Sequence, residues 1–311
     1  RVSSSAASDV YKRQIIDSSS WKWSVSGNIG VNRNEISDLG LLPADFGCLG
    51  ERVGYYGNSL GDHFGVGHIF LAGEAPGLFY GYVTQGIVQK EDITENGIKY
   101  IKQDGSVGYY QTVNKTTPVA GDVKYVDRNG DGVVDDNDRD IIGNPNPDFT
   151  YGFQTKVSWK SLSLSASFNG VQGRDILNVG NRYNNTPGTK SNNVTRKAFQ
   201  NMWTDENPSN LYPKSTFVVQ NMVMDRYVED GSYLRCSDIT LSYVLPAKWT
   251  NKIGIKNTSV YASVKNAFVI TDYSGYDPEV NSFAFDGLRP GVDMNSYPTP
   301  RSFVFGLNLT F

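Results

Sequence analysis

Residues 302–311, SFVFGLNLTF, alternate between larger apolar side chains and smaller, mostly polar ones. Successive side chains of a β-strand point to opposite sides, so a period of two residues predicts a strand with one apolar face. The stretch is about ten residues long, which is the length that a tilted transmembrane strand needs. The apolar set consists of Phe303, Phe305, Leu307, Leu309 and Phe311.

The same alternation recurs upstream in segments of similar length. It predicts strands around residues 23–31, 149–159, 162–169, 239–245 and 260–264, and a less regular strand within 66–72 or 78–88. The opposite faces of these strands are small and polar. We expect them to line a lumen or contact another domain, with a solvated sheet face as the alternative. One such series is Ser163, Ser165, Ser167 and Asn169.

The connections between these strands favour a membrane barrel over a soluble sandwich. Lys160 and Ser161 form a tight turn, the connection over 246–257 is longer, and those over 171–232 and 271–299 are very long. Short turns at one rim and long loops at the other are typical of outer-membrane barrels, whereas long loops are uncommon in compact soluble domains. Aromatic residues at strand ends could form interfacial girdles: Trp21, Trp23, Trp159, Tyr243 and Phe311.

The composition of the 311 residues excludes several classes of protein. Lys and Arg number 29 against 32 Asp and Glu, and the net charge of −3 offers no basic surface for nucleic acid. The chain contains no run of 18 apolar residues, which excludes a transmembrane helix. Cys48 and Cys236 lack metal-ligand spacing and are interpreted as two separate thiols, although they could pair in an oxidising compartment.

The first residues, RVSSSAASDVYKRQ, do not resemble the segments that follow. We interpret residues 1–14 as a non-native head and residues 15–311 as a partial barrel. No start Met and no signal peptide precede the first predicted strand, so we expect the chain to be a fragment.

A calcium-like loop, DRNGDGVVDDND, lies at residues 127–138. The hard cation Ca²⁺ needs several oxygen ligands from a short loop, with glycine at the sharp turn, here Gly132. Asp in place of Glu at the last ligand position predicts weaker binding, and a turn that binds no metal is the alternative. The predicted ligands of this structural Ca²⁺ are Asp127, Asn129, Asp131, the Val133 carbonyl, Asp135 and Asp138.

We predict no catalytic residue. GNSLG at 57–61 matches the G-x-S-x-G elbow of hydrolases, with Ser59 as nucleophile, but its surroundings predict no helix and coincidence is the favoured interpretation. His63 and His68 lack metal-ligand spacing with an acidic partner. The paired carboxylates at 135–136 and at 138 and 140 are better explained by the calcium-like loop than by acid–base catalysis.

The long predicted loops carry aromatic residues that could stack on sugar rings or pack against a partner protein. Self-packing of ordered loops explains these residues equally well. They are Tyr183, Trp203, Tyr212, Tyr273 and Tyr276.

Five stretches resemble the C-terminal half of the barrel in SusC/RagA-type TonB-dependent transporters of Bacteroidetes. They are EAPGLFYGYVTQGI (74–87), GDVKYVDRNGDGVVDDNDRDIIGNPNPDFTYGF (121–153), GSYLRCSDITLSYVLP (231–246), VYASVKNAFVITDYSGYDPEV (260–280) and PRSFVFGLNLTF (300–311). The resemblance implies a barrel of about 22 strands, an N-terminal plug, energy from the TonB complex and a SusD-like lipoprotein lid that delivers glycan or peptide. It leaves the plug and the N-terminal strands outside this chain.

The resemblance also implies a location in the cell outer membrane, in contact with lipid. The last strand, with Phe311 at its end, resembles the signal that the barrel-assembly machinery reads. If that strand ends in the periplasm, the loops 171–232 and 271–299 and the calcium-like loop lie outside the cell. The alternatives are a siderophore or vitamin receptor with the same barrel, a secreted calcium-binding β-sandwich that binds glycan, and a hydrolase that uses Ser59.

Overall fold

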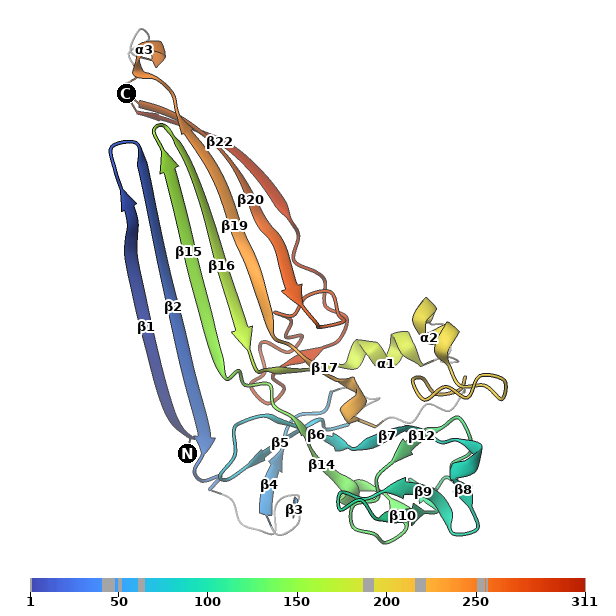
Figure 1. Cartoon of the computed structure of the whole chain (residues 1–311). Helices are drawn as coiled ribbons and strands as arrows, with labels where there is room; N and C mark the ends of the chain where they lie inside the picture. Colours follow the sequence, from blue (N-terminus) through green and yellow to red (C-terminus); the bar gives the residue numbers. More distant parts are fainter. Residues whose placement is uncertain are drawn as a thin grey trace.

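The computed structural model describes residues 2–40, 48–49, 52–60, 65–186, 193–215, 222–250, 255 and 257–310. One long, curved β-sheet stands on a compact body at one of its ends (Figure 1). We call this body the loop module. It consists of the described residues within 37–148, 173–232 and 272–301.

The long sheet is an antiparallel meander in which each strand pairs with the next sheet strand along the chain. All six strands predicted from clear alternation are confirmed. The strands, in sheet order, are β1 (Val2–Asp17), β2 (Trp21–Ile36), β15 (Phe149–Trp159), β16 (Leu162–Gln172), β19 (Tyr233–Val244), β20 (Asn257–Thr271) and β22 (Ser302–Thr310).

The register of the long sheet separates an apolar face from a polar one. Directly opposed residues of an antiparallel pair lie on the same face. One apolar row crosses five strands through Val157, Leu164, Leu241, Ala262 and Phe305. The adjacent polar row includes Ser165, Thr240 and Ser263.

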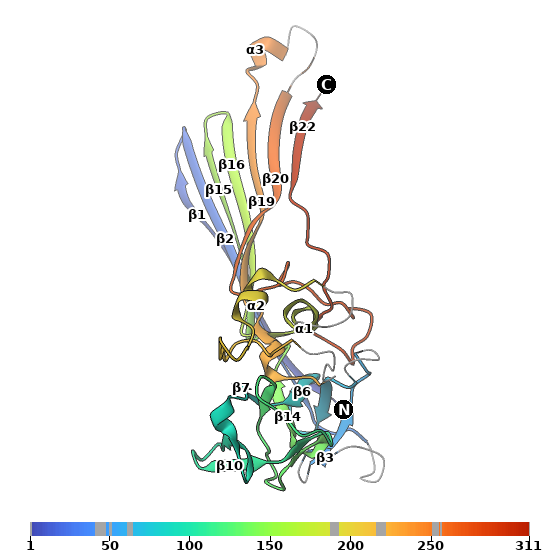
Figure 2. The ribbon, with the colours of Figure 1, turned by 90° about the vertical axis from the view of Figure 1, so that its right-hand side faces the viewer.

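No second sheet covers the apolar face within the described residues, and the long sheet is a single layer (Figure 2). Leu164 is 47% exposed, Leu241 46% and Phe305 79%. Exposing apolar area to water costs about 25 cal/mol per Å², and a contiguous patch of this kind marks contact with another apolar phase. The structure therefore favours a lipid-facing barrel wall over the β-sandwich alternative.

The dimensions of the apolar face fit a membrane. β15 has 11 residues, and a rise of about 3.3 Å per residue with a tilt of about 40° gives a span of roughly 25 Å. That value matches the apolar band of outer-membrane barrels. At one end of the band, Trp21 stacks on Trp159 with 5.9 Å between the ring centroids, and Tyr243 follows two strands further along the same row. Phe311 lies outside the described residues.

The predicted asymmetry of the connections is confirmed. The turns at 18–20 and 160–161 and the described part of the connection between β19 and β20, with the short helix α3 (Ala247–Thr250), all lie at the end away from the loop module (Figure 1). The other connections enter the loop module. None of the helices in the described part of the chain is long and apolar enough to cross a membrane.

The segment that we set aside as a non-native head lies in β1, which pairs with β2 along its whole length. Its side chains do not alternate, since the neighbours Val10 and Tyr11 are each 74% exposed on opposite faces. An open sheet edge offers unpaired N–H and C=O groups that any extended chain can satisfy. Backbone pairing therefore accounts for this strand, and its origin stays a prediction.

The loop module contains several small sheets that the alternation did not predict, apart from the segments at β5 to β7. The first sheet has the order β14-β6-β5-β4-β3, the second β10-β9-β8 and the third β18-β17-β21, and two further pairs are β11–β13 and β12–β7. The strands are β3 (Cys48–Leu49), β4 (Arg52–Tyr56), β5 (His68–Leu71), β6 (Leu78–Tyr82), β7 (Thr84–Ile87), β8 (Ile93–Thr94), β9 (Gly97–Ile101), β10 (Val107–Tyr110), β11 (Thr112–Val113), β12 (Val123–Tyr125), β13 (Val133–Val134), β14 (Arg139–Gly143), β17 (Asp175–Asn178), β18 (Val228–Asp230) and β21 (Val292–Asp293). Its helices are α1 (Val179–Asn185), α2 (Arg196–Asn201) and the 3-10 turns η2 (Lys90–Asp92), η3 (Asp136–Asp138) and η4 (Asp225–Tyr227).

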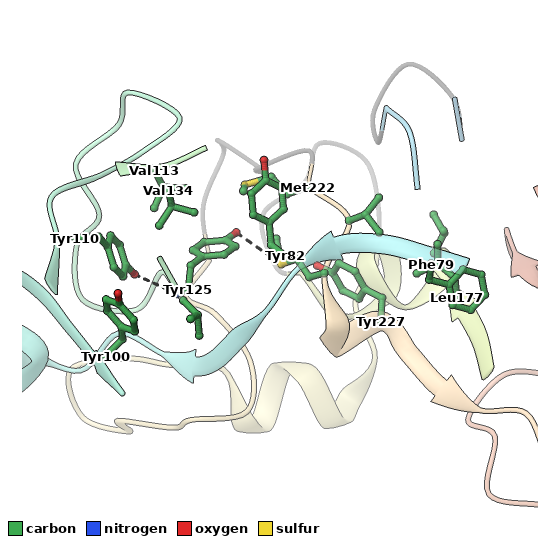
Figure 3. Close-up of a cluster of buried hydrophobic side chains, with 14 of the residues drawn as sticks. Phe79, Tyr82, Tyr100, Tyr110, Val113, Tyr125, Val134, Leu177, Met222 and Tyr227 are labelled. Atoms are coloured by element: carbon green, nitrogen blue, oxygen red, sulfur yellow. Dashed lines mark hydrogen bonds between the residues drawn. The ribbon is translucent and has the colours of Figure 1, made fainter. Parts of the chain in front are cut away.

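A tyrosine-rich core holds the loop module together (Figure 3). Tyr82, Tyr100, Tyr110 and Tyr125 are all at most 5% exposed, and the Tyr110 hydroxyl accepts a hydrogen bond from the backbone N–H of Tyr125 at 3.2 Å. Residues from all three long connections join the same core, among them Phe79, Leu177, Met222 and Val292. The long loops are therefore one folded unit.

Cys236 is a free, buried thiol on β19, which confirms for this residue the interpretation as separate thiols. The side chain of Cys48 lies outside the described part of the structure.

Leu164 and Ser165 are neighbours on β16 that point to opposite faces. In the full-length protein, Leu164→Lys places a charge on the lipid face at a cost of about 2–4 kcal/mol near the bilayer centre. We expect less folded protein in the outer membrane, measured by heat-modifiable migration in gels. The matched control Ser165→Lys faces the polar side and should assemble at nearly the normal level. Equal assembly of the two variants would contradict this assignment of the faces.

His68 in β5 is fully buried, with Nε2 at 2.9 Å from the Pro290 carbonyl oxygen. Burial is the main reason that its pKa falls from 6.5 to about 4. Below pH 6.5, His68 is protonated in the unfolded chain but stays neutral in the folded module until the pH approaches 4. The free energy of unfolding, which is highest above pH 6.5, therefore decreases as the pH falls. We expect the free energy of unfolding to drop by about 3 kcal/mol between pH 6.5 and 4.

The urea midpoint of the loop module at several pH values, followed by protease resistance, measures this loss. His68→Gln keeps a donor for the Pro290 carbonyl but does not titrate, so its midpoint should depend less on pH. The same slope in both proteins would show that His68 is not the responsible group.

Candidate functional site

The polar face of the long sheet carries a hydrogen-bonded cluster on β19 and β20. Asp238 accepts from the hydroxyls of Thr240 and Ser263, each at 2.7 Å, and Lys265 Nζ lies 2.6 Å from Asp238 Oδ2. The residues pair directly across the two strands, Asp238 with Lys265 and Thr240 with Ser263. Each member already has partners, so the cluster forms a polar wall for water or a neighbouring domain.

An ion pair joins the polar face to the loop module. Arg235 on β19 is 6% exposed, and its Nη2 lies 2.5 Å from Asp277 Oδ1. Asp277 also accepts from the backbone N–H of Thr299 at 3.3 Å. The contact ties the connection between β20 and β22 to the sheet where the strands end.

The calcium-like loop folds around two buried carboxylates. Asp127 is 2% exposed and accepts from the N–H groups of Gly130 at 2.6 Å and Gly132 at 2.9 Å. Asp138 is fully buried and accepts from Arg128 N at 2.7 Å and Asp135 N at 2.8 Å. Burial raises the pKa of Asp138. Within the described residues neither carboxylate forms an ion pair.

The other side chains predicted to bind calcium also accept hydrogen bonds from backbone N–H groups of this loop. Asn129 Oδ1 accepts from Asp131 N, Asp131 Oδ1 from Val133 N, and Asp135 Oδ1 from Asn137 N. Among the described residues, no three His, Cys, Asp or Glu side chains converge on a common metal position. The donors are all oxygen, as Ca²⁺ prefers, and a carboxylate oxygen that accepts one hydrogen bond keeps a second lone pair.

Two tyrosines of the module core donate hydrogen bonds to this loop. The Tyr100 hydroxyl donates to the Asp127 carbonyl oxygen at 2.6 Å, and the Tyr82 hydroxyl donates to Asp136 Oδ1 at 3.1 Å. Gly132 has a φ of +86°, a backbone conformation that side chains with a Cβ rarely adopt. The loop is therefore preorganised by local turns and by the core beneath it.

The five predicted aromatic residues do not share one environment. Trp203 and Tyr273 are buried and hydrogen-bonded inside the module, to Gln89 Oε1 at 3.0 Å and to Asp293 Oδ2 at 2.6 Å. Tyr183 packs against the module core. Tyr212 lines a pocket and Tyr276 is 70% exposed, so a binding role stays a prediction for these two.

Sequence reasoning missed other exposed aromatic residues of the rim. Phe285 is 83% exposed and Tyr297 is 92% exposed, both in the connection before β22. It also missed the polar pocket beside Tyr212, which Lys197 and Arg226 line. These residues lie in irregular segments, where no periodic signal distinguishes exposed from buried side chains.

The strand proposed as an assembly signal is β22, at an edge of the long sheet. Phe303, Phe305, Leu307 and Leu309 are all exposed on its apolar face, at 42–79%. Their reading by an assembly machinery stays a prediction.

The hydrolase interpretation finds no support in the described residues around Ser59. Ser59 forms an isolated antiparallel β-bridge with Val66 and does not lie at a strand-to-helix turn. Its carbonyl oxygen accepts a hydrogen bond from Arg289 Nη1 at 2.9 Å. Residues 57–60 and 65–71 contain no helix. His63 lies outside the described residues.

Several known proteins are similar in sequence. TonB-dependent receptor P3 of Formosa agariphila is 30% identical over 301 residues, covering 95% of this chain and 27% of that protein. TonB-dependent receptor P26 of the same organism is 29% identical over 300 residues, covering 94% and 27%. TonB-dependent receptor SusC of Bacteroides thetaiotaomicron is 34% identical over 194 residues, covering 60% and 17%. No protein-family model matches the chain.

Solved structures share the fold. The RagAB peptide transporter has a TM-score of 0.68 at 23% identity, and the RagAB peptide importer in its open-open state has 0.67 at 25%. Each match covers 100% of this chain and 29% of the other. The chain thus spans less than a third of the length of the relatives it matches. These relatives and the exposed apolar face lead to one conclusion: the chain belongs to the SusC/RagA-type TonB-dependent receptors and forms part of their β-barrel.

Proposed function

We propose that this chain forms part of the wall and outer rim of an outer-membrane importer of nutrients. The observation that carries the proposal is the single-layer sheet with an exposed apolar face and a hydrogen-bonded polar face. Such a sheet can separate lipid from an aqueous lumen. The names of the relatives, a receptor and a peptide transporter, support the same role.

The loop module would then lie on the extracellular side, where it meets cargo and a lid. Described residues of three long connections pack into its shared core. We propose a SusD-like lipoprotein as the lid and an oligosaccharide or peptide as the cargo. The TonB complex would act through parts of the full-length protein that this chain does not span, and the barrel-assembly machinery would read β22. The role is transport and not catalysis.

We also propose that residues 127–138 bind Ca²⁺ in the extracellular medium. Two buried carboxylates that accept backbone hydrogen bonds but form no ion pair within the described residues favour a nearby cation, because burying a charge is costly. Asp127, Asn129, Asp131, Asp135, Asp138 and the Val133 carbonyl would hold it. The ion would stabilise the rim by joining the two ends of the loop, near Asp127 and Asp138, next to the tyrosine core.

Loss of the full-length protein should abolish energised uptake of its cargo. We expect a deletion strain to accumulate less of either a labelled casein-peptide pool or a labelled starch-oligosaccharide pool, with restoration by the intact gene. A protonophore should remove the difference between the strains, because TonB-driven import needs energy. Unchanged uptake of both pools, or recovery of the protein in the soluble fraction, would contradict the proposed role.

Calcium binding can be measured by calorimetric titration of the full-length, calcium-depleted protein. Asp127→Asn keeps one acceptor for the loop N–H groups but removes the charge, so the heat of binding should disappear. At a Ca²⁺ concentration of about 100 times Kd, the wild-type module should gain about 2.7 kcal/mol of stability. Asp104→Asn is the matched control, since the Asp104 carboxylate accepts a hydrogen bond from the backbone N–H of Ser106 in a neighbouring exposed turn. No heat with the wild-type protein would end the calcium proposal.

A further inference from the structure

A pocket of about 230 Å³ opens in the loop module beside α1 and α2. These two helices lie side by side at the edge of the module (Figure 1). Residues of α1, α2, the segment 211–213 and η4 line the pocket. Its polar lining residues are Asn181, Asn185, Thr186, Lys197, Tyr212 and Arg226.

The pocket is positively charged. Lys197 and Arg226 line it, no Asp or Glu does, and neither cation forms an ion pair within the described residues. Other cations of the module have such partners, for example Lys124 with Asp92 at 2.8 Å. In the described part of the chain, Arg226 Nη1 has no hydrogen-bond partner. Arg226 Nη2 donates to the Leu211 carbonyl oxygen, so Lys197 Nζ and Arg226 Nη1 are the cationic groups left for an anionic ligand.

The amides of the pocket wall are already engaged. Asn181 donates to Ser274 Oγ at 3.2 Å, Asn185 Nδ2 donates to Asn181 Oδ1 at 2.7 Å, and Thr195 donates to Asn185 Oδ1 at 2.7 Å. This chain of hydrogen bonds fixes the wall in place. The donors left for a ligand are chiefly Lys197 Nζ and Arg226 Nη1, and the ring of Tyr212 supplies an aromatic surface beside them.

We propose that this pocket binds a carboxylate group of the cargo. Lys197 Nζ and Arg226 Nη1 can each donate a charge-assisted hydrogen bond to a carboxylate oxygen. The volume lies below the roughly 300–1,000 Å³ of sites that enclose whole small molecules, so the pocket holds one acidic group while the rest of the ligand lies outside. The inference rests on the proposed function only in taking this ligand as cargo.

Binding to the purified full-length protein in detergent tests the inference without requiring transport. The probes are a peptide pool with free C-terminal carboxylates, the same pool amidated, a galacturonate trisaccharide and its methyl ester. We expect a carboxylate probe to bind at least about tenfold more tightly than its capped form. The peptide and sugar arms identify the source of the carboxylate.

Lys197→Gln and Arg226→Gln should each remove this preference, and Arg226→Lys should restore part of it. Lys90→Gln is the matched control, because Lys90 forms an exposed ion pair with Asp205 outside the pocket. Lys197 is exposed, so its variant should fold even if an Arg226 variant does not. Equal affinity for free and capped probes, or full preference in Lys197→Gln, overturns the pocket. If the purified protein binds carboxylates but cells show no uptake, the proposed importer function is wrong and the pocket assignment stands.

Discussion

The structure depends on one constraint: a sheet of single thickness must satisfy two different media at once. Within lipid, every backbone N–H and C=O must be paired inside the protein, and side chains must alternate without error between the two faces. A register slip of one residue would exchange the faces of a whole strand. Aromatic rings laid over glycines help to hold the register. Tyr151 covers Gly170, where a Cβ would lie 2.4 Å from the ring, and Tyr261 covers Gly306 in the same way.

The constraint ends where the strands leave the membrane, and the chain then builds a different kind of core. Connections of this length would lose too much conformational entropy as separate ordered loops. Burial of shared apolar surface offsets this cost, and three different connections contribute Phe79, Leu177 and Val292 to it. Tyrosine suits such a core because its ring is apolar and its hydroxyl can serve nearby backbone groups. The result is one packed rim that carries both the calcium-like loop and the cationic pocket.

The parts that could be predicted from sequence are those whose signal is local. Alternation locates β15, β16 and β22 because each strand must satisfy both media over its own length. The calcium-like loop is also local, with its turns formed by Asp127 and Gly132. The burial of Trp203 and Tyr273 could not be predicted, because it depends on partners such as Gln89 that lie 114 residues away. β1 has no side-chain signal at all, since backbone pairing alone forms it.

The outer edges of the sheet show how this wall relates to the complete family barrel. β1 and β22 each pair on one side only within the described residues, so each presents a row of unpaired backbone groups. In lipid such rows are too costly to persist. Seven strands are also too few to enclose an aqueous lumen, because a barrel of about eight strands is filled by its own side chains. The curved sheet is therefore one arc of the wider family barrel.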